Sequence, residues 1–202
     1  MPPIAHYRDD RLEVRKACVG GFENNTYVLV CSKTGRSVVI DAAAEPNTIE
    51  RLASGTTPVA VLTTHGHVDH VGAARAISDH FSVPFRMDPQ DASIAGLAPD
   101  EPIGTDSIDV GEISIRPIAT PGHTPGSTCF AAAGLVFTGD TLFPGGPGAS
   151  RGPGASFERI MASIEEALFT LGDETLVLPG HGLDTTIGSE RPQLAAWFER
   201  GW

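Results

Sequence analysis

The chain has 202 residues, which is enough for one domain with a sizeable core and too few for two domains of ordinary size. Apolar residues make up 41% of the sequence, a share that excludes an intrinsically disordered chain. The 14 basic and 25 acidic residues give a formal net charge of −11. This balance argues against nucleic-acid and anionic-membrane partners, because both require clustered positive charge.

The first half of the sequence predicts strands separated by short helices. Apolar and β-branched runs indicate strands at residues 12–19, 26–31, 37–41 and 58–63. Pro46 is typical of a first helical turn, and this short helix is expected to end near Ala53. The spacing of apolar side chains predicts a second helix through Val71, Ala74, Ile77 and Phe81.

The second half repeats this pattern. Strands are expected at 113–118 and 128–138, the latter turning at Gly134, and a Gly/Pro-rich loop is expected at 145–155. There follow an amphipathic helix, a last strand and a terminal helix, expected at 157–171, 175–178 and 190–199. Two β-rich halves that each end in helices favour an α/β (α+β) fold with two face-to-face sheets, in one domain over residues 1–202.

The cysteines and the apolar runs bear on the cellular compartment. Cys18, Cys31 and Cys129 are widely spaced, which predicts three buried, unpaired thiols and no disulfide framework or zinc ribbon. The first twenty residues lack the apolar stretch of a signal peptide, and no segment has 18 consecutive apolar residues. We therefore expect a soluble, cytoplasmic protein without a membrane partner.

One short segment carries most of the chemical information. Residues 64–70 read Thr-His-Gly-His-Val-Asp-His, directly after the buried strand predicted at 58–63. Imidazole and carboxylate together form the ligand set of zinc and similar divalent metals. In an extended turn His65 and His67 point the same way and can hold one ion, whereas Asp69 and His70 can reach a neighbouring one. A surface cluster of polar loop residues is the alternative interpretation.

Three further side chains are candidates to complete this site. His123, Asp140 and His181 each follow an apolar strand and sit among glycines, so each is displayed at a strand end. Each of the three taken alone fits a capping or turn role equally well, and the His-rich segment is what favours a metal site. His6 and His80 lie in polar segments and are left out of the site.

Together these residues resemble the metallo-β-lactamase superfamily, over almost the whole chain. The stretch 65–70, His123, Asp140 and His181 follow the order of that family's motifs. The segments TPGHTPGS and FTGDTLF are similar to those of its glyoxalase II (hydroxyacylglutathione hydrolase) group, including short bacterial members. True β-lactamases of the superfamily carry a cysteine at the position of Asp140 and lack a histidine at that of His70. The resemblance implies an αββα four-layer sandwich with a dinuclear metal site at one edge.

The resemblance also implies a role for each candidate ligand. One ion would be held by His65, His67 and His123, and the other by Asp69, His70 and His181. Asp140 would bridge the two ions, and Asp69 would in addition be catalytic, beside the attacking hydroxide. Asp41, which matches the family's VVID motif, would orient a ligand histidine, with a simple strand-end turn residue as the alternative. The cofactor implied is two divalent ions per chain, zinc first, with iron or manganese as alternatives.

The implied reaction is hydrolysis of a small acyl thioester of the S-hydroxyacylglutathione type by a metal-bridging hydroxide. The sequence departs from glyoxalase II in lacking its C-terminal glutathione-binding helical domain and in having Ala149 where that group has a basic residue. Arg151 is the candidate substrate contact in its place, with a solvated loop arginine as the alternative. An open pocket is expected, walled by residues 143–156 and the terminal helix around Trp197.

Two other functions and one structural question stay open at this point. The sequence also resembles the mononuclear iron persulfide dioxygenases, a branch that uses positions equivalent to His65, His123 and Asp140. Another hydrolase of the superfamily, such as a lactonase, is the other alternative. A nucleic-acid-processing role is disfavoured by the charge of −11. The sequence leaves the oligomeric state undecided.

Overall fold

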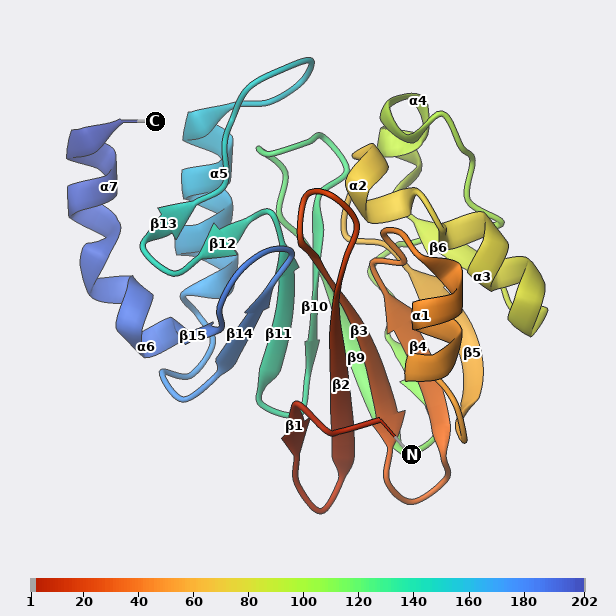
Figure 1. Ribbon diagram of the computed structural model, residues 1–202. Coiled ribbons are helices and arrows are strands. Elements are labelled where there is room, and N and C mark those ends of the chain that lie inside the picture. Colours follow the sequence, from red (N-terminus) through yellow and green to blue (C-terminus); the bar gives the residue numbers. More distant parts are fainter. Residues whose placement is uncertain (1–2, 202) are drawn as a thin grey trace.

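In the computed structural model, which describes residues 3–201, two twisted sheets pack face to face and helices cover both outer faces (Figure 1). This arrangement confirms the predicted αββα sandwich. The apolar side chains between the sheets form one continuous core that includes Leu29, Phe130 and Phe137. Further buried clusters lie between each sheet and its own helices.

The first sheet contains seven strands that follow one another in chain order. The first four are antiparallel and the last four, beginning with the fourth, are parallel. The strands are β1 (Tyr7–Arg8), β2 (Leu12–Val19), β3 (Asn24–Cys31), β4 (Arg36–Ile40), β5 (Thr57–Leu62), β6 (Phe85–Met87) and β7 (Glu101–Pro102).

The second sheet contains six strands in the order β15-β14-β11-β10-β9-β8. Its pairs are antiparallel except for β11 with β14, which run parallel. The strands are β8 (Ile108–Val110), β9 (Ile113–Ala119), β10 (Thr128–Ala132), β11 (Leu135–Gly139), β14 (Leu176–Pro179) and β15 (Thr185–Thr186). A separate small ribbon is formed by β12 (Leu142–Phe143) and β13 (Gly146–Pro147).

The helices divide into two layers, one on each outer face (Figure 1). Against the first sheet lie α1 (Pro46–Leu52), α2 (Val68–Val71), α3 (Ala74–Phe81), the 3₁₀ turn Pro89–Asp91 and α4 (Ala92–Ala95). Against the second lie α5 (Phe157–Ser163), the π-helical turn Ile164–Leu168, α6 (Ile187–Glu190), the 3₁₀ turn Arg191–Gln193 and α7 (Leu194–Arg200). None of the helices within residues 3–201 has the length and apolar character needed to cross a bilayer.

The helix predicted through Val71 and Phe81 is interrupted between α2 and α3. A Cβ at Gly72 would lie 2.6 Å from the carbonyl oxygen of Ala43, so only glycine allows this close approach to the loop after β4. The next amide, that of Ala73, donates to the carbonyl of Ala42 at 2.9 Å and not to the preceding turn. Packing of the short α2 against the loop therefore overrides the helical periodicity.

Two expectations about buried residues need correction. Cys18 is exposed on β2, whereas Cys31 and Cys129 are buried as expected. Trp197 does not wall an open pocket, because its side chain is 3% exposed and packs in the apolar cluster beneath α7. The indole is a core residue because the helix turns its apolar face onto the second sheet.

Candidate metal centre

The predicted ligands converge at one edge of the sandwich, where strands of both sheets end. The loop after β5 supplies the His-rich segment, and the loops after β9, β11 and β14 supply His123, Asp140 and His181. Two backbone hydrogen bonds join the sheets at this edge, from Asn25 N to the Gly180 carbonyl at 2.7 Å and from Thr128 N to the Thr64 carbonyl at 2.8 Å. The loops are therefore held on a rigid frame.

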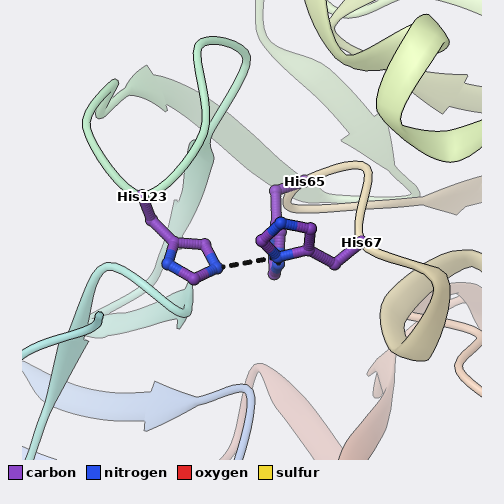
Figure 2. A group of neighbouring side chains, drawn as sticks. All are labelled: His65, His67 and His123. Atoms are coloured by element: carbon purple, nitrogen blue, oxygen red, sulfur yellow. Dashed lines mark hydrogen bonds between the residues drawn. The ribbon is translucent and has the colours of Figure 1, made fainter. Parts of the chain in front are cut away.

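His65, His67 and His123 form the first donor group, with their rings facing a common point (Figure 2). The Nδ1 atom of His67 lies 3.1 Å from His65 Nε2 and 2.9 Å from His123 Nε2. Metal–nitrogen bonds of about 2.1 Å place neighbouring ligand atoms about 3.0–3.4 Å apart, depending on octahedral or tetrahedral geometry. The spacing of the three nitrogens fits one ion.

Asp69, His70 and His181 form the second donor group, at the start of α2 and after β14. The Oδ2 atom of Asp69 lies 3.4 Å from His181 Nε2 and 3.8 Å from His70 Nε2. His70 is fully buried, whereas Asp69 and His181 are partly exposed. Two nitrogens and a carboxylate oxygen at these distances are a second set that fits an ion.

Asp140 lies between the two groups and turns one oxygen to each. Its Oδ2 is 3.6 Å from His123 Nε2, and its Oδ1 is 3.4 Å from His70 Nε2 and 3.7 Å from His181 Nε2. The Oδ1 atom is buried and has no hydrogen-bond partner within residues 3–201. A buried carboxylate oxygen without a partner is costly unless a cation satisfies it, so the residues present fit a pair of metal ions.

Hydrogen bonds on the far side of the rings fix the orientation of three histidines. His123 Nδ1 donates to the Ala149 carbonyl at 2.7 Å, and His181 Nδ1 donates to the Phe22 carbonyl at 2.9 Å. His70 Nδ1 lies 2.9 Å from Asp41 Oδ2, and the same Asp41 carboxylate accepts from the amide and hydroxyl of Thr64, each at 2.8 Å. A proton on each Nδ1 leaves each Nε2 unprotonated and directed at the centre.

The electrostatics of the cluster favour the metal-binding forms of four side chains. Burial and the neighbouring imidazoles lower the pKa of His65 well below its ordinary value, and burial with His123 lowers the pKa of His67. The hydrogen bond from His181 lowers the pKa of Asp69 against the opposing effect of burial. The charges of His70, His123 and His181 likewise outweigh burial and lower the pKa of Asp140. Neutral imidazoles and ionised carboxylates are the species that bind metals.

Burial alone would lower the pKa of His70, but the attraction of Asp41 and Asp140 outweighs it and raises the value to about 10. The hydrogen bond with Asp69 raises the pKa of His181. Without a metal, therefore, the second donor group favours a positive charge. A bound cation meets the same electrostatic requirement.

Sequence reasoning missed Asp91, which connects two of the ligand loops through hydrogen bonds. Its fully buried carboxylate accepts from the amide of Gly66 at 2.8 Å, the amide of Gly126 at 2.7 Å and the hydroxyl of Thr124 at 2.6 Å. It thereby connects the His65–His67 loop to the His123 loop. A lone aspartate in a short turn carries no signal of such a role, because its partners lie 25–35 residues away.

Two clefts open beside the donor groups. A cleft of about 420 Å³ is lined by His67 and His123 together with Ser93, Ile94, Arg151, Gly152 and Pro153. Arg151 is exposed there and makes no hydrogen bond or ion pair within residues 3–201. A second cleft, of about 320 Å³, is mainly apolar and reaches Asp69 and Asn24 from the side of Phe22 and Val68.

Comparison with known proteins places the chain among metal-dependent enzymes. The sequence profile of the metallo-beta-lactamase superfamily matches residues 19–181. The probable metallo-hydrolase YqgX of Bacillus subtilis is 32% identical over 89% of this chain and 94% of its own. The hydroxyacylglutathione hydrolase GloC of Haemophilus influenzae is 34% identical over 65% of this chain and 72% of its own.

Solved structures show the same fold. TTHA1623 in a di-iron-bound form superposes with a TM-score of 0.77 and 32% identity, covering 87% of this chain and 96% of that one. ETHE1 from Myxococcus xanthus superposes with a TM-score of 0.79 and 30% identity, covering 91% of this chain and 84% of that one.

Proposed function

This chain belongs to the metallo-beta-lactamase superfamily, and from that membership we propose a metal-dependent hydrolase that cleaves small acyl thioesters of the S-hydroxyacylglutathione type. The observation that carries the proposal is the shared carboxylate. Asp140 offers one oxygen to each of two complete donor groups, and its buried Oδ1 has no hydrogen-bond partner in the part of the chain that the structure describes. The relation to GloC of Haemophilus influenzae supports the thioester as substrate.

The metal ions, when bound, supply a water of lowered pKa as nucleophile and a Lewis acid for the substrate carbonyl. The two donor groups would hold one ion each, and zinc, iron and manganese all suit such nitrogen and oxygen ligands. Asp69 adds an ionised carboxylate at the exposed side of the second group, where it can accept a hydrogen bond from the attacking water and orient it. Asp41 fixes His70 by accepting from its Nδ1 atom. No serine or cysteine nucleophile is needed.

Arg151 supplies the positive charge in the cleft beside the first donor group. It shares this cleft with His67 and His123, so a substrate carboxylate bound to it lies next to the reacting centre. We propose that this contact replaces the basic residue whose aligned position is Ala149. The Ala149 backbone has a different task, because its carbonyl holds His123.

The iron persulfide dioxygenase is the second candidate, because TTHA1623, a similar chain, is known in a di-iron-bound form and iron therefore suits a related site. That function would employ only His65, His123 and Asp140. In that function Asp69, His70 and His181 would have no role, although their ligand atoms lie within 4.8 Å of one another. The geometry thus supports the dinuclear hydrolase better.

The test is a kinetic panel of S-lactoylglutathione, other anionic thioesters and uncharged thioesters with the metal-loaded chain. We expect hydrolysis that a chelator abolishes, and a loss of about 10-fold or more in kcat/KM for the anionic substrates alone in Arg151→Ala, corresponding to one charged contact. The control is Arg36→Ala, at an exposed site on β4. Equal losses for charged and uncharged thioesters would refute the role of Arg151, and oxygen uptake on a persulfide without thioester cleavage would refute the hydrolase.

A further inference from the structure

Asn24 stands inside the second donor group, although no motif of the sequence draws attention to it. It is the first residue of β3, and its side chain is 2% exposed. Its Nδ2 atom lies 3.1 Å from Asp69 Oδ2, 3.3 Å from His70 Nε2 and 3.3 Å from His181 Nε2. All three neighbours are the metal-facing atoms of the proposed ligands.

The distances describe a coordination polyhedron. The tip of the Asn24 amide and the three ligand atoms are separated by 3.1–3.8 Å along the five edges that can be given. Neighbouring ligands at about 2.1 Å from an ion are about 3.0–3.4 Å apart in octahedral or tetrahedral geometry. The amide tip thus lies at the spacing of a further ligand, in addition to Asp140 Oδ1, and does not fill the position of the ion.

The backbone keeps Asn24 in this place. Asn24 forms an isolated antiparallel bridge with His181, and the next residue, Asn25, donates its amide to the Gly180 carbonyl at 2.7 Å. The Asn25 side chain donates in turn to the carbonyls of Pro179 at 2.9 Å and Gly182 at 3.0 Å. The start of β3 and the His181 loop therefore form one unit, and Asn24 is positioned together with a proposed ligand.

We propose that Asn24 is a ligand of the second ion through its side-chain oxygen. A half-turn of the amide exchanges Nδ2 and Oδ1 at the vertex, and Oδ1 accepts no hydrogen bond within residues 3–201 that this turn would break. A cation at the centre repels the hydrogens of the NH₂ group and attracts the oxygen. Amide oxygens are established ligands of divalent ions, most of all of hard ones. This inference rests on the metal centre of the proposed function.

The test compares the affinities of the two ions by chelator competition and elemental analysis in the wild type, Asn24→Ala, Asn24→Asp and the control Asn47→Ala. Asn47 is exposed on α1, away from the site. We expect Asn24→Ala to weaken the second ion about 10- to 100-fold, the range found for groups that support metal sites, and to leave the first unchanged. Asn24→Asp, with an oxygen at the same place, should bind the second ion at least as tightly as the wild type.

Unchanged or tighter binding of the second ion in Asn24→Ala overturns the inference, and tighter binding would show that the amide competes with the ion. If the alanine variant does not fold, a folded Asn24→Asp chain with a weakened second site overturns it equally. The readout is independent of thioester cleavage. If the wild type holds two ions and cleaves no thioester, the proposed function is refuted and the role of Asn24 is not affected. If metal binding is unchanged in Asn24→Ala, the role of Asn24 is refuted and the proposed function is not affected.

Discussion

Asp140 is the residue on which the dinuclear interpretation depends most. Each of its oxygens faces a different donor group, and Oδ1 is buried without a hydrogen-bond partner among the described residues 3–201. The glycine before it is equally constrained, since a Cβ at Gly139 would lie 2.3 Å from the Thr64 hydroxyl. The end of β11 is therefore shaped to deliver one carboxylate between two sets of ligands.

Replacing Asp140 with alanine should remove metal and activity together. Both donor groups lose a ligand, so we expect fewer bound ions per chain and a fall in kcat/KM of about 10²–10³-fold or more, the scale of a lost electrostatic catalytic group. Elemental analysis and a thioester assay on the same preparation check this. His80→Ala is the control, because His80 is exposed on α3, where it pairs with Glu50 at 3.4 Å. Near-normal turnover in the Asp140 variant contradicts a shared ligand.

Short turns between the secondary-structure elements position the ligand loops. The 3₁₀ turn Pro89–Asp91 has no catalytic residue, yet it delivers Asp91 to the backbone of both histidine loops. A Cβ at Gly66 or Gly126 would lie 2.6 Å from the Asp91 carbonyl and 2.8 Å from its carboxylate, respectively. The two glycines are thus required for the loops to approach this turn.

Asp91→Ala should destabilise the metal-free protein as well as loosen the site. Three buried donors lose their acceptor, and at about 1–3 kcal/mol for each unsatisfied group we expect a loss of roughly 2–4 kcal/mol after partial relaxation. Denaturant unfolding in the presence of a chelator measures this. Asp79→Ala, at an exposed site on α3, should stay within about 0.5 kcal/mol of the wild type. A loss equally small for Asp91→Ala would show that water replaces the carboxylate at no cost.

Asp100 gives the fold a weak dependence on pH. Its carboxylate accepts from the Phe85 amide at 2.9 Å and from Arg75 through both oxygens at 2.8 Å, and these bonds lower its pKa. A lowered pKa in the folded state stabilises the protein above the unfolded value, about 3.9, and the contribution disappears as the pH falls through the folded value.

Asp100→Asn should therefore be less stable than the wild type at pH 7 by about 0.5–1 kcal/mol, a small amount because the carboxylate is 40% exposed. The difference should shrink below about pH 5 and vanish where aspartic acid is protonated in both states. Urea unfolding of the metal-free chains between pH 7 and pH 3 checks this. A difference that is constant across the range contradicts the ionic origin.

The longer strands are the elements that the sequence predicts correctly. The eight-residue β2 and the β10–β11 pair agree with the expected ranges to within one or two residues. The sequence predicts no helix or strand at residues 82–112, because β6, β7 and β8 have only two or three residues each and show no periodicity. The predicted helix at 157–171 likewise becomes α5 followed by a π-helical turn at Ile164–Leu168. Tertiary packing decides these details.

Some residues of the candidate site can be predicted from the sequence, and others cannot. The seven proposed ligands were identified from short motifs, and the structure brings all seven together. The structure places Asp41 against His70, whereas no sequence motif includes Asn24 or Asp91. Their partners are far along the chain, 45 to 157 residues from Asn24, so only the packed sheets reveal them. Isolated polar residues carry no pattern that sequence reasoning can use.

At the scale of the whole molecule, the charge of −11 constrains how an anionic substrate is recognised. Charges farther than about 8 Å apart are largely screened at physiological salt, so local groups decide binding. In the larger cleft Arg151 is the charged residue beside His67 and His123. We expect specificity to depend on this contact and on the metal centre, with little contribution from long-range attraction.

If the proposed function is correct, two ions bound at this centre make the chain a thioester hydrolase. The most direct measurement is a titration of the metal-free chain with zinc, in which bound ions per chain and the rate of S-lactoylglutathione hydrolysis are followed together. We expect no hydrolysis without metal and a rate that reaches its maximum at two ions per chain. Full activity with one ion or none, or a chain that binds two ions and leaves the thioester intact, would contradict a dinuclear thioester hydrolase.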